Sequence, residues 1–119
     1  MIRLITCLKR RAEIGPVEFR EYWQAPEFDA LIERVVAHTG AEHFAKNLTL
    51  TIAANQLLMH DRGLGEPFDG VLEYWWHDVA HFETLYNDSN SKALMREMQD
   101  YQQQFADIST SVSFFTESN

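Results

Sequence analysis

Short strand-like segments and longer helical stretches alternate along this chain in an order that few folds can accommodate. Four segments have the alternating or continuous apolar pattern of a β-strand: Ile2–Leu8, Ala41–Ala53, Gly70–His77 and Ile108–Thr116. The stretches after the first and after the third segment instead have apolar residues three and four positions apart, which is typical of a helix. The order is therefore β-α-β-β-α-β, and it predicts that the four strands lie in one antiparallel sheet.

The length of the chain fits a single domain built on that order. Its 119 residues are enough for one hydrophobic core and too few for two. Hydrophobic residues make up 45% of the sequence, which excludes a disordered chain. We therefore expect one domain over residues 1–119, of the α+β class, with a ferredoxin-like, four-stranded antiparallel sheet.

Two prolines divide the first helical stretch. Gly15 and Pro16 predict its start, because the missing N–H of a proline has no partner to lose in the first turn of a helix. Pro26 falls inside the apolar pattern, so it predicts a kink or a second helical piece that continues to about His38. Gly40 then stands where a C-terminal cap glycine belongs.

The segments on either side of the third strand predict a loop and two helices. The segment Ala54–Asp69 is rich in turn residues, lacks a clear period and is long enough to act as a lid over an opening. Asp78 is a good N-cap for the helix that follows it. Asn87–Ser91 interrupts that helix, and Ser91 can cap a last helix with an apolar stripe of Leu94, Met98, Tyr101 and Phe105.

The parity of the apolar residues assigns the two faces of the sheet. Successive side chains of a strand point to opposite faces, so residues of one parity lie together. Even positions are the apolar ones in every strand-like segment, and we expect the helices to pack on this even face. These positions are Ile2, Leu4 and Leu8, then Leu48, Leu50 and Ile52, then Leu72, Tyr74 and Trp76, and finally Ile108, Val112 and Phe114.

The odd face of the sheet predicts a second copy of the chain. It combines small polar residues with the large apolar side chains of Ile5, Trp75 and Phe115. Such a face is too apolar to be fully exposed and too polar to be a dry core, so we expect a homodimer in which two sheets pack together. Glu73 lies on the same face, where a cross-strand ion pair with Arg3 is the preferred interpretation and a carboxylate inside a ligand cavity is the alternative.

Charge and cysteine content exclude several classes of function. A formal net charge of −8 argues against nucleic acid or an anionic membrane surface as a partner. No apolar segment approaches the roughly 20 residues of a membrane span, and the basic cluster of Lys9, Arg10 and Arg11 follows the first apolar run, which is the reverse of a signal peptide. Cys7 is the single cysteine, so an intrachain disulfide and the usual thiolate zinc sites are excluded. We expect a cytoplasmic protein.

Four large aromatic side chains are candidates for a ligand-binding pocket. Tyr22 and Trp23 lie on the first helical stretch, and Tyr74 and Trp76 lie on the even face of the third strand. Together they could form a flat apolar slot between the sheet and the first helix, with hydroxyl and indole N–H groups for a planar ligand. Plain core packing is the alternative for each residue taken alone.

Histidines are the candidate proton-transfer groups. His43, His77 and His81 lie nearest to the predicted pocket, and we expect His43 or His81 to act if the protein has chemistry there. Solvated surface positions are the alternative for all of them. The sequence has no HExxH motif, no facial-triad spacing and no glycine-rich phosphate loop, so we predict neither a metal site nor a bound cofactor.

Several segments resemble the EthD family, within the dimeric α/β-barrel superfamily. They are Lys9-Arg10 at the end of the first strand, PVEFREYW (Pro16–Trp23), FDGVLEYW (Phe68–Trp75) and the final strand of Ser, Val and Phe. Family members usually carry His-Gly-Pro after the aromatic pair of the first helix, whereas this chain has Gln24-Ala25-Pro26. The resemblance implies a homodimeric barrel with a pocket between the sheet and the helices of each subunit.

The resemblance also implies a function, and two interpretations stay open. The first is an enzyme that acts without a bound cofactor on an aromatic or polyketide-like compound, with lyase, cyclase or monooxygenase chemistry in a catabolic or biosynthetic pathway. The second is a non-catalytic accessory protein that holds a hydrophobic ligand in the same pocket. A catalytic histidine has to lie within hydrogen-bond reach of the ligand, which separates the two interpretations. In both, the expected ligand contacts are Tyr22, Trp23, Tyr74, Trp76 and Glu73.

Overall fold

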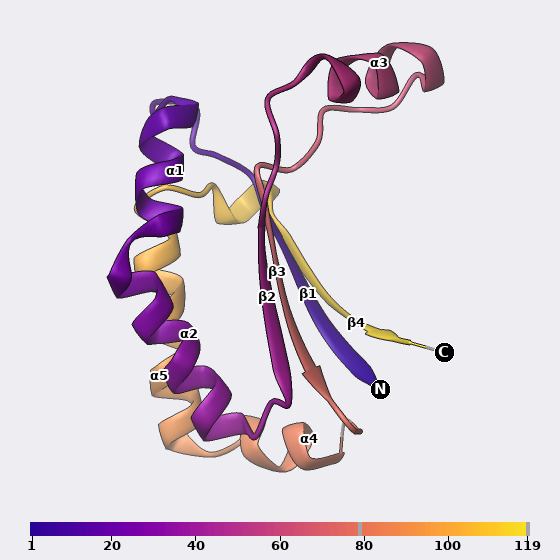
Figure 1. Cartoon of the computed structure of the whole chain (residues 1–119). Coiled ribbons are helices and arrows are strands. Elements are labelled where there is room, and N and C mark those ends of the chain that lie inside the picture. The colour runs from indigo at the N-terminus through magenta and orange to yellow at the C-terminus, as the bar shows by residue number, and fades with distance from the viewer. Residues whose placement is uncertain (79, 119) are drawn as a thin grey trace.

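A single antiparallel sheet of four strands, in the order β2-β3-β1-β4, organises the computed structural model. Its strands are β1 (Ile2–Leu8), β2 (His43–Leu48), β3 (Gly70–Trp76) and β4 (Val112–Glu117). The structure describes residues 1–78 and 80–118, except for the side chains of residues 81, 84 and 85. Helices α1 (Pro16–Gln24), α2 (Pro26–Thr39) and α5 (Ser89–Gln102) cover one face of the sheet, and the other face is open (Figure 1). The predicted α+β, ferredoxin-like fold is therefore confirmed.

The predicted break in the first helical stretch is also present. Pro16 begins α1 and Pro26 begins α2, with Ala25 between the two helices in extended conformation. Lys46 reaches across from β2, and its Nζ donates to the Trp23 carbonyl at 2.8 Å and to Asp29 Oδ1 at 2.6 Å. Lys46 thus supplies a donor to a carbonyl in the last turn of α1, where the proline prevents the helix from continuing. Gly40 ends α2 in the left-handed region, with φ of 71°.

The segment between β2 and β3 differs from its prediction. The strand expected to reach Ala53 ends at Leu48, and helix α3 (Ala53–Arg62) replaces the loop expected from Ala54. Gly63, with φ of 62°, caps this helix and so contributes one of the turn signals that suggested a loop. The segment of residues 49–69, here called the arm, extends from the end of the sheet on its open side (Figure 1).

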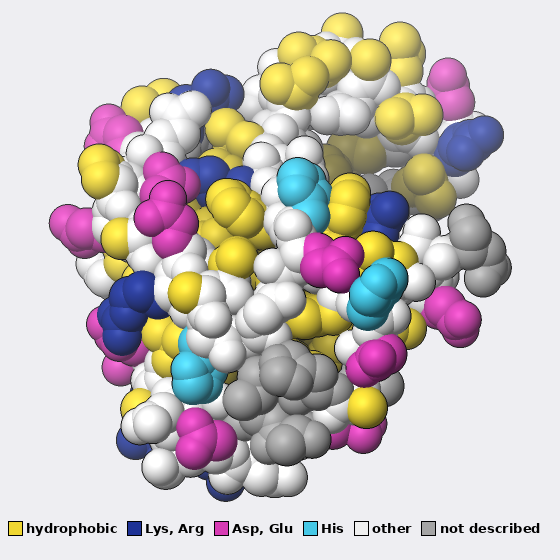
Figure 2. Space-filling view, turned by 60° about the horizontal axis from the view of Figure 1, so that its bottom comes forward, with side chains coloured by type: hydrophobic (Ala, Val, Ile, Leu, Met, Phe, Trp, Pro, Cys, Tyr) yellow, Lys and Arg dark blue, Asp and Glu magenta, His cyan; other side chains and the backbone are white. Residues whose placement is uncertain are grey.

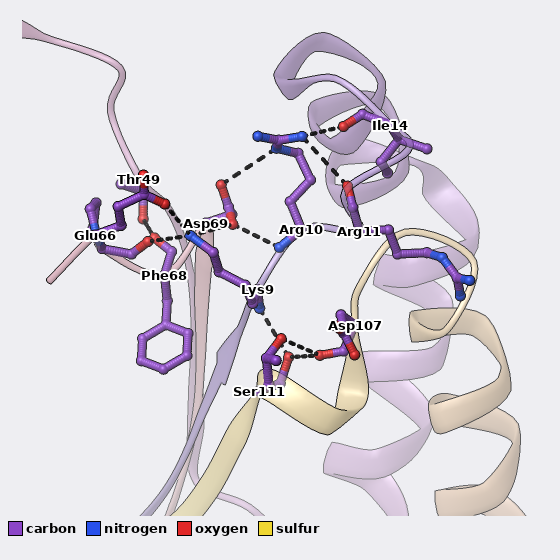
Figure 3. Close-up of polar contacts among 12 residues, drawn as sticks. Lys9, Arg10, Arg11, Ile14, Thr49, Glu66, Phe68, Asp69, Asp107 and Ser111 are labelled. Atoms are coloured by element: carbon purple, nitrogen blue, oxygen red, sulfur yellow. Dashed lines mark hydrogen bonds and ion pairs between the residues drawn. The ribbon is translucent and has the colours of Figure 1, made fainter.

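Polar contacts attach the base of the arm to the end of β1 (Figure 3). The carboxylate of Asp69 accepts a hydrogen bond from the backbone N–H of Arg10 at 2.7 Å. The backbone N–H of Asp69 in turn donates to the Leu8 carbonyl at 2.9 Å. Lys9 Nζ donates to Glu66 at 3.3 Å. The basic residues after β1 therefore hold the arm in place through neighbouring acidic groups.

Along the chain, helix α4 (Ala80–Tyr86) and helix α5 follow β3 and precede β4. Asp78 Oδ1 accepts a hydrogen bond from the Ala80 N–H at 3.1 Å, as expected of a residue at a helix start. The last helix begins at Ser89, so the predicted cap at Ser91 is wrong. Ser91 is buried instead, and its Oγ shares a hydrogen bond of 2.6 Å with His38 Nε2 on α2. Val79, expected in this helical stretch, lies outside the described residues.

The face assignment is right for β1, for β3 and for Leu48 of β2, and it is wrong for β4. Leu50 and Ile52, which were assigned to the same face, lie beyond the end of β2 and are exposed. Leu4 pairs with Tyr74 and with Phe115, so Phe115 shares the face that carries the helices. Val112 and Phe114 consequently lie on the open face, opposite to the prediction. A short 3₁₀ helix over Ile108–Thr110, closed by the Asp107 side chain accepting from the Ser109 N–H, precedes β4 and shifts the phase of the strand.

Aromatic rings fill the core beneath α1 and α2. Phe19 stacks on Trp23 with ring centroids 5.8 Å apart, and Tyr22 stacks on Phe105 at 5.3 Å. Phe28 packs edge-on against Trp23 at 5.2 Å. These rings are in the range of favourable aromatic contacts, so this half of the interior is close-packed. No helix among the described residues is long and apolar enough to cross a membrane.

Candidate ligand-binding cavity

A cavity of about 440 Å³ lies between the helix-bearing face of the sheet and helices α4 and α5. Its walls come from β1, β3 and β4 on one side and from α4, α5 and Val35 of α2 on the other. At the edge strand β4 it is lined by Phe115, whose side chain lies on the helix-bearing face and is more than two-fifths exposed. The cavity therefore opens to solvent along β4, and its volume is in the range of pockets that hold small molecules.

Small polar side chains in the sheet create the space. Thr6 on β1 pairs with Ser113 on β4, and their hydroxyl oxygens are 2.9 Å apart. Ser111 lies just before β4 and also lines the cavity. Because these side chains are short, they leave space between the sheet and α5 that larger side chains would fill.

On the helix side, the cavity is lined by a row of side chains along one face of α5. Met95, Gln99 and Gln102 recur at helical spacing along this row and line the cavity. Gln102 is 7% exposed, which is unusual for a glutamine, and it brings a buried carboxamide to the cavity wall. Met95 is unbranched and adapts its shape to irregular space. The row thus combines an adaptable apolar residue with polar groups that can orient a ligand.

An aromatic wall forms the opposite end of the cavity. Tyr74 and Trp76 on β3 stack with ring centroids 5.9 Å apart, and Trp76 contacts Phe82 of α4 at 5.2 Å. Phe82 in turn packs edge-on against Phe115 of β4 at 5.0 Å. The Trp76 indole N–H donates to the Thr39 carbonyl at 3.2 Å, which fixes the orientation of the ring. The wall is therefore held in place without a ligand.

The Tyr74 hydroxyl is a polar group in this wall that has no partner within the described part of the protein. Tyr74 is 4% exposed, and its hydroxyl oxygen is buried without a hydrogen bond. Burial raises the pKa of this hydroxyl, because the charged form would lose its hydration. The group therefore keeps its proton at neutral pH and adds no charge to the wall.

The described lining of the cavity carries no charge. It consists of aliphatic, aromatic, hydroxyl and carboxamide side chains, and none of these residues is Lys, Arg, His, Asp or Glu. A charged ligand would lose its hydration on entering without gaining an ion pair in return. The arrangement can hold an uncharged molecule of mainly apolar surface and offer it a few hydrogen bonds.

The aromatic residues predicted to form the pocket divide into two pairs. Tyr74 and Trp76 line the cavity, whereas Tyr22 and Trp23 are packed against Phe105 and Phe19 in the core. The predicted position between the sheet and the first helix is therefore wrong, and the space lies beside α5 instead. The arm was expected as a lid, but none of its residues lines the cavity.

Two of the three predicted histidines, His43 and His77, lie outside the described lining of the cavity. His43 is exposed on β2, with its ring 4.4 Å from that of Trp75 on the open face. His77 is exposed after β3, with Nε2 3.7 Å from Glu42 Oε1. The histidines visible in Figure 2 are likewise separated by other side chains. His81 belongs to α4, and its side chain lies outside the described residues.

Glu73 lies on the open face of the sheet rather than in the cavity. Its Oε1 is 3.9 Å from Arg3 Nη1, so the expected cross-strand ion pair is present. The Arg3 guanidinium also lies over the ring of Trp75, at 4.2 Å from its centroid. Among the described residues, no three His, Cys, Asp or Glu side chains are grouped so that they could hold a metal ion.

Comparison with known proteins identifies the fold and leaves the family unassigned by sequence. Neither a protein-family model nor a curated protein sequence matches the chain. An EthD family protein from Bacillus halodurans has a similar structure, with a TM-score of 0.64 and 12% identity, over 100% of this chain and 99% of that one. A dimeric protein of unknown function and ferredoxin-like fold from Bacteroides fragilis gives a TM-score of 0.61 at 12% identity, over 98% and 95% of the two chains.

An enzyme also has a similar structure. The hydroxynitrile lyase from Passiflora edulis has a TM-score of 0.57 and 12% identity, over 99% of this chain and 94% of that one. At such identities the likeness concerns the fold, and it confirms the resemblance to EthD proteins at that level. What this chain binds has to be argued from its own cavity.

Proposed function

We propose that this protein binds an uncharged, largely apolar small molecule, aromatic or polyketide-like, in the cavity between β4 and α5. The observation that carries the proposal is the uncharged described lining of a cavity of about 440 Å³ that already opens to solvent. Aromatic rings on one side and short hydroxyl side chains on the other suit a flat compound with a few oxygen atoms. Holding such a ligand is the function that this geometry supports best.

The proposal is tested with three two-ring compounds that differ in charge. 2-Naphthalenemethanol is neutral, 2-naphthoate is an anion and 2-naphthylmethylammonium is a cation at neutral pH. At ten times its Kd, a ligand stabilises the folded protein by about 1.4 kcal/mol, which raises Tm by roughly 4–8 °C. We expect this shift for the alcohol alone. A larger shift with either ion would contradict an uncharged site.

A cavity-filling variant locates the binding site. Ser113 faces the cavity, so Ser113→Leu places a larger side chain in the space and is expected to abolish the Tm shift. Gln104→Leu is the matched control, because Gln104 is exposed and does not line the cavity. If both variants keep the full shift, the compound binds elsewhere.

Catalysis is the second candidate function, and the position of His81 in α4, next to the cavity-lining Phe82, is the observation that favours it. His81 stays a prediction for a proton-transfer group. Turnover of the bound compound by the wild-type protein, lost in His81→Ala while binding remains, is the result that this second function requires.

We infer a homodimer from the open face of the sheet. Ile5, Trp75 and Phe114 lie on that face, and Val112 and Phe114 are exposed there. The Trp75 indole N–H is buried without a partner in the described protomer. The arm extends on the same side and carries exposed Leu50, Ile52, Leu57, Leu58 and Leu64, and hydrophobic side chains gather at the top of Figure 2.

A second copy on this side would bury the sheet face and the arm together. An interface of that kind is expected to cover on the order of 2,000 Å², in the size range of obligate dimers. Sedimentation velocity at micromolar concentration is the test, and a species of twice the chain mass is the expected result. A monomer at that concentration would contradict the dimer.

A further inference from the structure

The two ends of the cavity differ in chemistry. Trp76 pairs with Ile2 on β1, whereas Ser113 pairs with Thr6, four residues further along the same strand. At about 3.3 Å per residue, the two pairs are about 13 Å apart along the sheet. Phe82 of α4 packs against Trp76 at the first end. The cavity therefore has an aromatic end near α4 and a polar end at Thr6 and Ser113, here called the hydroxyl pair.

Gln102 lies at the polar end. Helix α5 follows α4 and runs from there towards the opposite end of the sheet, and Gln102 is its last residue (Figure 1). The chain just after α5 is attached to the end of β1, because the Asp107 N–H donates to the Lys9 carbonyl at 2.8 Å. The Lys9 N–H in turn donates to Ser111 Oγ at 2.9 Å, and Ser111 and Gln102 both line the cavity. Gln102 therefore belongs to the same end as the hydroxyl pair.

The Gln102 carboxamide has unused hydrogen-bonding groups that a ligand can reach. Gln102 is 7% exposed, and its carboxamide makes no hydrogen bond with the described residues. The fully occluded polar atoms without a partner in the described chain belong instead to Arg3, Arg10, Tyr74 and Trp75. The oxygen and nitrogen of the carboxamide thus keep accessible surface, and the cavity that Gln102 lines is the space from which they are reached. Buried polar groups in native proteins are rarely left unpaired, so this carboxamide points to a ligand.

The polar end offers donors and acceptors together. Thr6 Oγ1 and Ser113 Oγ share one exposed hydrogen bond of 2.9 Å. A single hydrogen lies between these oxygens, so the proton of the second hydroxyl is left for another acceptor. Gln102 adds two N–H donors and one carbonyl acceptor. A ligand hydroxyl uses both kinds of group, whereas a ketone or an ether only accepts and would leave the Gln102 oxygen dehydrated and unpaired.

We propose that Gln102 sets the direction in which the ligand lies, by binding a hydroxyl group of the ligand while the ligand's rings rest against the aromatic end; this assignment rests on the function proposed above. The hydroxyl donates to the carboxamide oxygen and accepts from the hydroxyl pair. The ligand class is thereby narrowed to neutral aromatic alcohols and phenols.

The experiment uses three probes with the same number of non-hydrogen atoms. 2-Naphthalenemethanol donates and accepts, 2-naphthaldehyde only accepts, and 2-ethylnaphthalene does neither. Their Kd values are measured by calorimetry with the wild-type protein, Gln102→Leu and Gln99→Leu. In Gln102→Leu the Kd of the alcohol is expected to rise about tenfold and that of the aldehyde by less, while the Kd of the hydrocarbon stays unchanged or falls.

Gln99→Leu is the matched control, because Gln99 lines the same cavity but is exposed, so its carboxamide is already hydrated. It is expected to leave all three Kd values unchanged. Gln102→Leu is expected to keep or raise the Tm of the free protein, because it removes an unpaired buried group. An equal rise in Kd for alcohol and hydrocarbon in Gln102→Leu would overturn the assignment. A rise for the aldehyde as large as that for the alcohol would overturn the choice of a hydroxyl group.

Nuclear Overhauser effects in the wild-type protein test the direction of the bound alcohol without a substitution. The hydroxymethyl protons are expected to contact the Gln102 side-chain amide, and the far ring protons to contact Trp76. If the alcohol binds in the cavity in the reverse direction, the Gln102 assignment fails while the cavity proposal stands. If none of the three probes binds the wild-type protein, both fail.

Discussion

Gly70 allows the core to close around Trp23, and its replacement by alanine probes that packing directly. A Cβ atom at position 70 would lie 2.6 Å from both Cη2 and Cζ3 of Trp23 and 3.0 Å from Cε3. Carbon atoms in contact are normally about 3.5–4.0 Å apart, so the ring would have to move by roughly 1 Å. Trp23 is 2% exposed and held between Phe19 and Phe28, which leaves it no free direction.

Overpacking of this kind costs about 1–3 kcal/mol, and the reduced freedom of the unfolded chain returns about 0.4–1 kcal/mol. We therefore expect Gly70→Ala to lower the free energy of unfolding by about 1–2 kcal/mol, seen in urea as a lower midpoint at constant slope. Gly65→Ala is the control, because a Cβ there meets no atom within 4 Å. It should be neutral or slightly stabilising.

A double-mutant cycle with Trp23→Phe assigns the cost to the indole ring. Phenylalanine is shorter, so Gly70→Ala should cost about 1 kcal/mol less in that background. A Gly70→Ala protein as stable as the wild type would refute the close packing of this core. An equal cost in both backgrounds would show that the clash lies elsewhere.

Three further predictions concern the open face and the tyrosines. Trp75→Ala should weaken dimerisation and lower stability together, by about 3–5 kcal/mol if the indole is buried in the dimer; unchanged mass and Tm would mean that Trp75 stays exposed. Burial, and then the charge of Glu73, raise the pKa of the Cys7 thiol, so its reaction with a disulfide reagent at neutral pH should be slower than that of free cysteine; an equal rate would contradict this. Burial raises the pKa of Tyr101 to about 12 from 10.0. Because the unfolded chain releases this proton first, stability should fall as the pH rises from about 10 towards 12, and less steeply in Tyr101→Phe; equal slopes would argue against the shift.

Much of the fold could be predicted from local signals because each has a local cause. Pro16 and Pro26 lack the N–H that a continuing helix would need, and Gly40 adopts a conformation that other residues avoid. Alternation along β3 is unambiguous, since Leu72, Tyr74 and Trp76 are all buried. These signals suffice for the element order and for the face of the sheet that carries the helices.

The errors arise where the deciding contact is distant in the sequence. Phe114 and Phe115 are adjacent, so either parity of β4 buries one aromatic ring, and pairing with Leu4 decides which. In the arm, the turn residues on either side of α3 suggested a loop, and the fold buries none of the residues of this helix. Ser91 has the chemistry of a helix cap, but its hydroxyl is used by His38 of another helix.

Part of the candidate site could be predicted and part could not, again because the deciding contacts join residues that are distant in the sequence. The even face of β3 was enough to predict that Tyr74 and Trp76 line the site. The position of the cavity, however, depends on the short side chains opposite α5, which are those of Thr6, Ser111 and Ser113. Gln102 was missed, although a glutamine beside the buried Tyr101 was a usable signal. Large aromatic side chains suggested a cavity near α1, yet they fill that space by stacking.

A crystal structure of the protein grown with 2-naphthalenemethanol tests the central claim most directly. We predict one molecule per protomer between β4 and α5, in contact with Tyr74 and Gln102 and with the Tyr22 and Trp23 packing unchanged. Density for the compound on the open sheet face near Glu73, with the space beside α5 empty, would contradict the proposed site.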